Sequence, residues 1–256
     1  MIPLKDYNPT RRFPYVTVLL IAINVGVFIF IQRPFSSNAS KDAKFSYEYA
    51  AIPCEVVTGR PLTDTEITQT LGPAGDANAC QRDTKPTPDQ EIFPSKNVWL
   101  AILYSMFLHA GWLHIGGNML FLWIFGNNIE DRMGPMPYLG FYLASGLVAA
   151  AAHIGVQPSS TVPVVGASGA IAGVMGAYLV LFPNVPIRTL LLFLLVFIRD
   201  IPAKWLLGFW FVLQFFNGSG SGVAWVAHVG GFIFGALIAL LLRDRLRPSR
   251  VEVGAA

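Results

Sequence analysis

Long apolar runs separated by short polar segments dominate the chain beyond residue 14. No Asp or Glu lies between Asp131 and Asp200, or between Asp200 and Asp244. Runs of about 20 apolar residues are typical of helices that cross a bilayer, and shorter runs cross only with tilt or local thinning. The pattern predicts spanning helices at 15–32, 112–131, 138–156, 168–182, 203–217 and 223–242.

The remaining segments are polar or too short to span. Residues 1–14 form an N-terminal segment, and 33–111 form a long, irregular first loop rich in Pro, Asp and Thr. The apolar stretches 98–108 and 189–198 are only about half of a spanning length, so we place both in the membrane interface. The predicted fold is therefore an all-α polytopic membrane protein with six spanning helices, a long first external loop and a short basic tail at 243–256.

Composition and charge agree with membrane residence and give an orientation. Apolar residues make up 54% of the chain and charged residues 13%, against about 25% in soluble domains. The net charge of +3 is small, which argues against nucleic-acid binding. The loops at 157–166 and 217–222 contain no Lys or Arg, so the positive-inside rule places both termini in the cytosol. The first apolar run is long for a cleaved signal peptide, and we interpret it as a retained anchor.

Both cysteines, Cys54 and Cys80, fall in the first external loop. An oxidising compartment would allow them to form a disulfide that closes part of this loop. Two unpaired thiols are the alternative.

A serine and a histidine lie among small residues inside the apolar runs. Ser168 heads the span 168–182, and Ala172 and Gly176 follow it at helical spacing. His228 lies near the start of the last span, on the same side of the membrane, and Gly231 and Gly235 follow it. Small-residue faces let helices approach closely, which a base needs in order to reach a hydroxyl. The structural alternative is a packing face with a serine bonded to its own helix. No span holds an acidic residue that could orient His228, so the prediction is a dyad and not a triad.

His114 and Asn118 are spaced i, i+4 on the second span, with His109 just before it. Their side chains can face one spot and donate hydrogen bonds to a developing oxyanion. Hydrogen bonding between helices is the structural alternative. A metal site of His109, His114 and His228 is disfavoured because no carboxylate and no His-Glu-x-x-His motif accompanies them.

Together these motifs resemble the rhomboid intramembrane serine proteases of the bacterial type, over the first span and about the last 160 residues, with a core at 98–242. The motifs are His109 with His114 and Asn118, Glu130-x-Arg132-x-Gly134, Gly166-x-Ser168-Gly169 and Ala227-His228-x-x-Gly231.

The resemblance implies a six-helix bundle around a water-filled cavity and no cofactor. Ser168 would be the nucleophile and His228 the base. His114, Asn118 and the Ser168 amide would form the oxyanion hole. Other motif residues would have supporting roles: His109, Gly166, Gly169, Gly231, Glu130 and Arg132. The fifth span would gate access of the substrate.

Two positions depart from the family pattern. Some members carry a tyrosine one turn after the nucleophile, which stacks on the histidine, and Ala172 occupies that position here. A Trp-Arg pair common in the first loop is not evident, because Leu100 follows Trp99. Neither departure affects Ser168 or His228.

The expected function is intramembrane serine endopeptidase, which cleaves single-span membrane proteins through an acyl-enzyme in a bacterial inner membrane. The expected partners are membrane-protein substrates and the lipid bilayer. An inactive binder of membrane helices is the main alternative, and the lack of an internal repeat argues against a transporter. Substrate identity and oligomeric state are not predicted.

Overall fold

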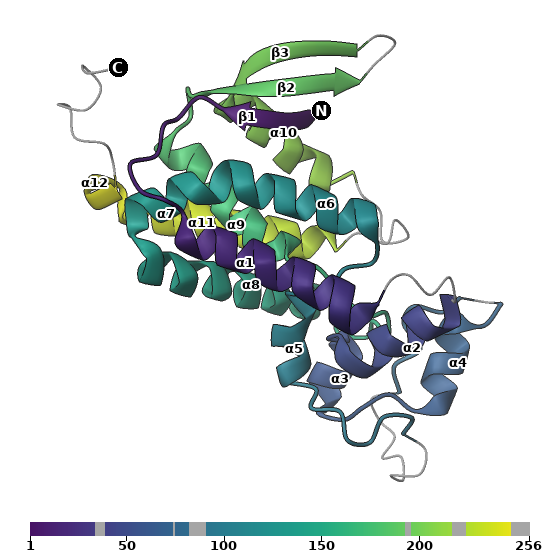
Figure 1. Ribbon diagram of the computed structural model, residues 1–256. Helices are drawn as coiled ribbons and strands as arrows, with labels where there is room; N and C mark the ends of the chain where they lie inside the picture. Colours follow the sequence, from purple (N-terminus) through teal and green to yellow (C-terminus); the bar gives the residue numbers. More distant parts are fainter. Residues whose placement is uncertain (34–38, 74, 82–90, 193–195, 217–223, 247–256) are drawn as a thin grey trace.

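The apolar helices lie side by side in the computed structural model, which describes residues 1–33, 39–73, 75–81, 91–192, 196–216 and 224–246 (Figure 1). The first helix is α1 (Tyr15–Gly26), which continues as the π-helical segment η1 (Val27–Gln32). Next come α6 (Trp112–Phe121), η3 (Leu122–Gly126) and α7 (Asn127–Met133), and then α8 (Pro135–Val156). The bundle is completed by α9 (Ser168–Leu181), α10 (Ala203–Gln214) and α11 (Trp225–Leu241), and the short α12 (Arg243–Leu246) follows.

By length and composition, two helices in the described part of the chain could cross a membrane. They are Tyr15–Gln32 and Pro135–Val156, whereas Ser168–Leu181 and Trp225–Leu241 are apolar but shorter. The described part of the chain is mostly helical. The count of six spanning helices stays a prediction. Parts of several expected segments lie outside the described residues: 34–38, 74 and 82–90 of the first loop, 193–195 of the stretch 189–198, the span ends at 217 and 223, and 247–256 of the tail.

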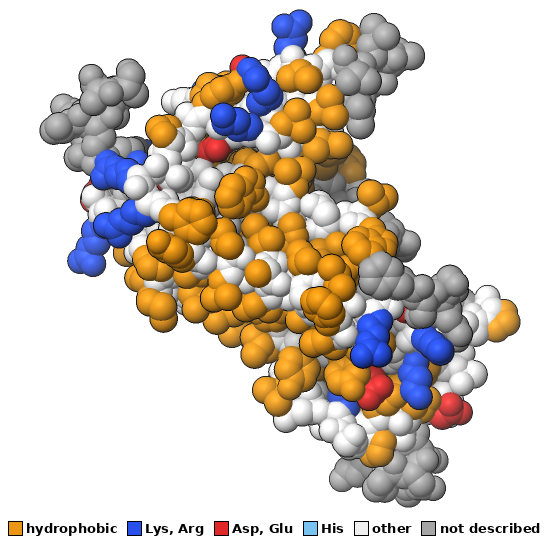
Figure 2. Space-filling view, in the orientation of Figure 1, with side chains coloured by type: hydrophobic (Ala, Val, Ile, Leu, Met, Phe, Trp, Pro, Cys, Tyr) orange, Lys and Arg blue, Asp and Glu red, His pale blue; other side chains and the backbone are white. Residues whose placement is uncertain are grey.

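The central helix of the bundle is α9. Its residues from Gly169 to Tyr178 are all buried, and α8, α10, α11 and η3 pack against it. Large apolar side chains on other helices face outwards instead, among them Leu19, Ile23, Leu147 and Leu237. Figure 2 shows apolar side chains over the middle of the bundle, with Lys and Arg gathered toward its ends. An apolar belt between charged ends is the surface that a bilayer requires.

A three-stranded antiparallel sheet corrects the expectation of an all-α fold. The strand β1 (Ile2–Asp6) pairs with β2 (Pro186–Leu192), and β2 pairs with β3 (Val196–Pro202). The register places Ile2 opposite Leu190 and Arg188 opposite Asp200. Burial alternates from Pro186 to Thr189, as expected for a strand. The apolar run at 189–198 hid this alternation, and the partner strand lies at the other end of the chain.

The described part of the first loop folds as a helical unit, which corrects the expectation of an irregular loop. We call residues 39–73, 75–81 and 91–105 the first-loop subdomain; it contains α2 (Ala39–Tyr49), α3 (Pro53–Thr58), α4 (Asp64–Leu71) and α5 (Leu100–Ser105). It has its own small core, formed by Tyr47, Ile52, Cys54 and Leu62. Figure 1 shows it at the end of the bundle remote from the N-terminus and the sheet. In this subdomain, Cys54 and Cys80 are joined by a disulfide.

Candidate active site

Close packing of α9 against α11 brings Ser168 and His228 together. A Cβ added at Gly231 would collide with the carbonyl oxygen of Gly169, and one added at Gly235 would collide with that of Gly173. A Cβ at Gly169 would lie 2.7 Å from the Ala149 side chain on α8. The backbones therefore touch along a glycine face, as small residues allow in membrane helices.

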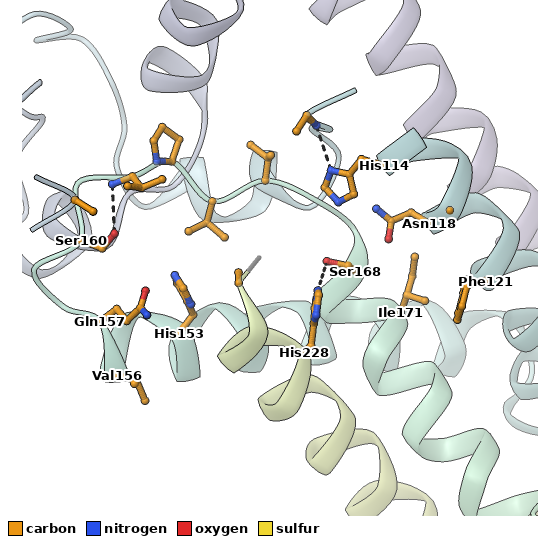
Figure 3. Close-up of a pocket in the computed structure, with 18 of the residues that line it drawn as sticks. His114, Asn118, Phe121, His153, Val156, Gln157, Ser160, Ser168, Ile171 and His228 are labelled. Atoms are coloured by element: carbon orange, nitrogen blue, oxygen red, sulfur yellow. Dashed lines mark hydrogen bonds between the residues drawn. The ribbon is translucent and has the colours of Figure 1, made fainter. Parts of the chain in front are cut away.

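The Ser168 hydroxyl and the His228 ring form a hydrogen bond. Ser168 Oγ lies 2.8 Å from His228 Nε2 (Figure 3). Ser168 is the first residue of α9, and His228 lies in the first turn of α11. Both side chains line a cavity of about 980 Å³ between the helices and the loop that precedes Ser168. A serine and a base at this distance meet the geometric requirement for nucleophilic catalysis.

Gln214 on α10 bonds the other side of the His228 ring, a contact that the motifs in the sequence did not predict. Gln214 Oε1 lies 2.8 Å from His228 Nδ1, and Gln214 Nε2 donates to the Trp210 carbonyl oxygen at 2.9 Å. Because the amide nitrogen is engaged by a carbonyl, the amide oxygen faces His228 and accepts from Nδ1–H. The ring tautomer inferred from this network leaves the Nε2 lone pair free to accept from Ser168.

Trp210 takes up the space beside His228. The centroids of the two rings lie 5.7 Å apart with an interplanar angle of 39°. Ala172 on α9 has no aromatic ring to offer His228, and the indole beside this histidine belongs to α10. The packing of His228 therefore depends on α10 through both Trp210 and Gln214.

Gly166 makes room for the His114 ring next to Ser168. Its φ of +130° lies where side chains other than glycine are strained. A Cβ at this position would lie 2.9 Å from His114 Cε1 and 3.0 Å from His114 Nε2. The same Cβ would be 3.4 Å from Ser168 Oγ, so the imidazole of His114 and the hydroxyl of Ser168 flank one point.

His114 and Asn118 present hydrogen-bond donors to the cavity. His114 Nδ1 accepts from the Ala110 amide at 3.2 Å, which leaves Nε2 as the protonated nitrogen on the Gly166 side. Asn118 Nδ2 is buried and has no hydrogen-bond partner within the described residues. Figure 3 shows both side chains across the cavity from His228.

His109 supports His114 from behind. The two ring centroids are 5.2 Å apart, and Gln32 bonds both the amide and the carbonyl of His109, at 2.9 and 3.0 Å. Burial first, and then the nearby His114, lower the pKa of His109 to about 4. The ring is therefore neutral near pH 7, as packing against a second imidazole requires.

Glu130 and Arg132 lie far from the cavity and tie helix ends together. The Glu130 carboxylate accepts from the amides of Val16 and Thr17 at 2.8 Å, and so caps the start of α1. The Arg132 guanidinium lies 5.6 Å from the centroid of the Phe182 ring, just after α9. Their roles in this structure are therefore architectural.

The first-loop subdomain holds the loop that leads into Ser168. Backbone amides of Cys54 and Val164 donate to the carbonyls of Ser160 and Ala51, at 2.9 and 2.8 Å. The Gly166 amide donates to the Ser105 carbonyl at 2.9 Å. In the described residues, one cluster has metal-ligand atoms close together, namely Cys54, Glu66 and Cys80, and its two sulfurs are bonded to each other.

Comparison with known proteins identifies the class. The Rhomboid domain family matches residues 96–245, so the chain belongs to the rhomboid family, whose members are integral membrane proteins.

Individual relatives agree with this assignment. The chain is 32% identical over 169 residues to Rhomboid protease AarA of Providencia stuartii, which covers 60% of each chain. It is 29% identical over 160 residues to Rhomboid protein 1, mitochondrial, of Saccharomyces cerevisiae, covering 59% of this chain and 44% of that protein. To Rhomboid protease GluP of Bacillus subtilis it is 33% identical over 150 residues, covering 56% and 26%.

The chain therefore spans less than two thirds of the length of these relatives. Because they include bacterial and mitochondrial proteins, the comparisons support the family and not the narrower bacterial type.

Proposed function

We propose that this protein is an intramembrane serine endopeptidase that cleaves single-span membrane proteins within or near their membrane helix. The observation that carries the proposal is the 2.8 Å hydrogen bond between Ser168 Oγ and His228 Nε2 in a large cavity. Family membership and the printed names of the relatives support the same reaction class.

In the acylation step, Ser168 Oγ attacks the carbonyl carbon of the scissile peptide while His228 Nε2 takes the hydroxyl proton. The imidazolium then gives this proton to the leaving amine, and an ester to Ser168 remains. In the second step, water attacks the ester, His228 removes its proton, and the proton returns to Ser168 Oγ as the acid product leaves. Gln214 keeps the ring oriented throughout, because its carbonyl oxygen holds Nδ1–H.

Charge on the tetrahedral intermediate would be stabilised by three donors. The Ser168 amide belongs to the first turn of α9, where amides have no partner within the helix. His114 Nε2–H and Asn118 Nδ2–H face the same region from α6. Loss of one such donor costs about 10²- to 10³-fold in rate in well-studied hydrolases.

The proposed orientation places both termini in the cytosol and the cavity toward the exterior, with the first-loop subdomain outside. The pairing of β1 with β2 supports a common side for the N-terminus and residues 186–202. The disulfide in the first-loop subdomain suits an oxidising exterior.

The test is cleavage of a panel of single-span reporters by the purified protein in detergent. Cleavage by the parent and its loss in both Ser168→Ala and His228→Ala are expected. Ser46→Ala, in α2 and away from the cavity, is the matched control and should cleave like the parent. Cleavage that persists in Ser168→Ala would overturn the mechanism.

A second readout separates a protease from an inactive binder of membrane helices. An alkyl fluorophosphonate reacts with an activated serine: Ser168 Oγ bonds to phosphorus, fluoride leaves, and His228 takes the proton. Labelling at Ser168 that disappears in His228→Ala is expected. A folded parent that binds reporters but is neither labelled nor active would be the inactive binder.

A further inference from the structure

The cavity at Ser168 has two chemically different ends. On one side of Ser168, Figure 3 shows the apolar side chains of Phe121 and Ile171 lining the cavity, beside Asn118. On the other side, beyond the Ser168–His228 pair, Figure 3 shows the polar side chains of His153, Gln157 and Ser160. Apolar residues of the loop at 162–165 also line the cavity, and we call the group of three polar side chains the polar end. The reaction described above uses none of the groups at the polar end.

His153 is the central group of this polar end. It lies in the last turn of α8, and its side chain is buried, with 6% of the residue exposed. Its Nδ1 has no hydrogen-bond partner within the residues that the structure describes. Figure 3 shows the ring pointing into the cavity between Gln157 and His228. A buried nitrogen without a partner costs free energy, so a ligand atom that bonds it gains more than a surface contact would.

Gln157 extends the same wall by one helical turn. Its amide donates to the His153 carbonyl at 2.9 Å, which closes α8 and fixes the spacing of the two side chains. Both side chains border the cavity. An imidazole and a carboxamide together offer hydrogen-bond donors and acceptors that can engage a planar oxygen-bearing group.

The charge of the lining narrows the choice of ligand. No Lys, Arg, Asp or Glu occurs among the described residues that border the cavity, and its titratable groups are His114, His153 and His228. Any charge gained there is positive, so a cationic ligand is disfavoured and a carboxylate or a neutral carboxamide is favoured.

We propose that His153 and Gln157 form a subsite that binds a carboxylate or carboxamide side chain of the substrate, a few residues from the scissile bond. This subsite rests on the proposed function, and it selects substrates by an Asp, Glu, Asn or Gln on the side of the cut opposite the apolar end. His153 acts in binding and takes no part in proton transfer at Ser168.

The test uses reporters that carry Asp, Asn, Leu or Lys at successive positions on both sides of the cut. At one position, Asp and Asn should give a kcat/KM at least tenfold above Leu, with Lys lowest, and the difference should lie in KM. In His153→Leu the Asp-to-Leu ratio should fall to within about twofold. His153→Asn places a carboxamide near the position of Nδ1 and should retain part of the Asp-to-Leu ratio. Gln157→Leu should lower this ratio less than His153→Leu does.

Leu147→Ala on the lipid-facing side of α8 is the control and should keep the parent ratio. Each rate is divided by that of labelling with an alkyl fluorophosphonate, which has no side chain to reach α8. Labelling of Ser168 without any Asp or Asn preference, or a preference unchanged in His153→Leu, would overturn the subsite alone. Absence of both labelling and cleavage in the parent would overturn the proposed function as well.

Discussion

The α9–α11 contact and the first-loop subdomain both position Ser168, but they are held together by opposite means. Between α9 and α11, glycines let backbone touch backbone, and Gly231 and Gly235 leave no room for a methyl group. The first-loop subdomain instead has a small apolar core, a disulfide and buried ion pairs. In lipid no hydrophobic gain drives helices together, so close packing has to suffice, whereas in water burial and cross-links contribute.

This difference predicts how each part of the site responds to substitution. We call the α9–α11 contact the brittle part and the loop at 157–167 the adjustable part. A helix contact made of backbone atoms has no side chain that can move aside, so one added carbon affects the whole contact. The loop at 157–167 is held by separate hydrogen bonds to the first-loop subdomain, and each can weaken without loss of the others.

The largest effect is expected at Gly235. The added methyl of Gly235→Ala would meet the backbone of Gly173, so α11 must shift and carry His228 away from Ser168. Overpacking that forces backbone shifts costs about 1–3 kcal/mol, and occasionally more. Activity should fall about a hundredfold or more, because a misplacement of about 1 Å can cost about 10²-fold. The thermal midpoint in detergent should also drop.

Gly140→Ala on α8 is the matched control, because a Cβ there meets nothing within 4 Å. It should be neutral or slightly stabilising, since alanine favours helix over glycine by about 1 kcal/mol. Equal midpoints for the two variants would refute the close-packing account of this contact.

A second test separates packing from ring orientation. Gln214→Leu leaves the α9–α11 contact intact but removes the acceptor for His228 Nδ1. The ring can then adopt the unproductive tautomer, so kcat should fall about tenfold to a hundredfold while KM changes little. Gln214→Glu keeps an acceptor for Nδ1–H, so its kcat should exceed that of Gln214→Leu. Its carboxylate also favours the imidazolium form of His228, so the pH–rate profile should shift to higher pH. A pH profile of Gln214→Leu identical to the parent in both height and shape would exclude this role.

Sequence patterns predicted the brittle part of the site better than the adjustable part. The small-residue spacing after Ser168 and His228 predicted a close helix contact, since that information is local. Gln214 was missed although a polar side chain inside an apolar helix was the available signal. The pairing of β1 with β2 could not be predicted, because β1 lies at the N-terminus and β2 far along the chain, at Pro186–Leu192.

The sequence of the first-loop subdomain contains motifs that indicate where single helices begin and end, but not how these helices pack. Thr63 and Glu66 form a capping box at the start of α4, and Pro53 begins α3, which ends at Gly59 with a φ of +71°. These motifs mark helix ends, but the polar composition of the first loop favoured a prediction of irregular structure. How the subdomain docks on residues 160–166 depends on backbone hydrogen bonds that side-chain patterns do not encode.

Removal of the disulfide tests how strongly the first-loop subdomain supports the adjustable part, the loop at 157–167. Replacing Cys54 and Cys80 by serine releases a loop closed across a sequence separation of 26, which should cost about 3 kcal/mol of stability in this subdomain. Because Cys54 also bonds Ser160 through its amide, kcat/KM for protein reporters should fall several-fold. Labelling of Ser168 by an alkyl fluorophosphonate should fall less, since the α9–α11 contact stays in place.

Reductant gives the control for that variant. Dithiothreitol should lower the activity of the parent toward that of the double-serine variant and leave the variant unchanged. A parent that keeps full activity after complete reduction would show that the cross-link does not support the loop.

The smallest effect is expected from Glu66, which organises the same subdomain. Burial acts to raise the pKa of Glu66, but hydrogen bonds from Arg60, Thr63 and Gln81 outweigh it, so the pKa lies below its usual value. A carboxyl with a lowered folded-state pKa contributes stability above its unfolded pKa and loses it as the pH falls through the folded value. Glu66→Gln should therefore cost about 1 to 2 kcal/mol at neutral pH. Its deficit relative to the parent should shrink in acid.

The buried pair of Glu55 and Lys96 is present in both the parent and the variant, so most of its opposite pH dependence cancels in the difference. Glu66 contributes only the smallest of the effects on the pKa of Glu55. Burial raises the pKa of Glu55 and lowers that of Lys96, and the two groups lie 2.6 Å apart. Unfolding midpoints of parent and variant measured from pH 7 down to pH 4 give the comparison. A deficit that stays constant over this range would mean that Glu66 stabilises the subdomain through packing and not through its charge.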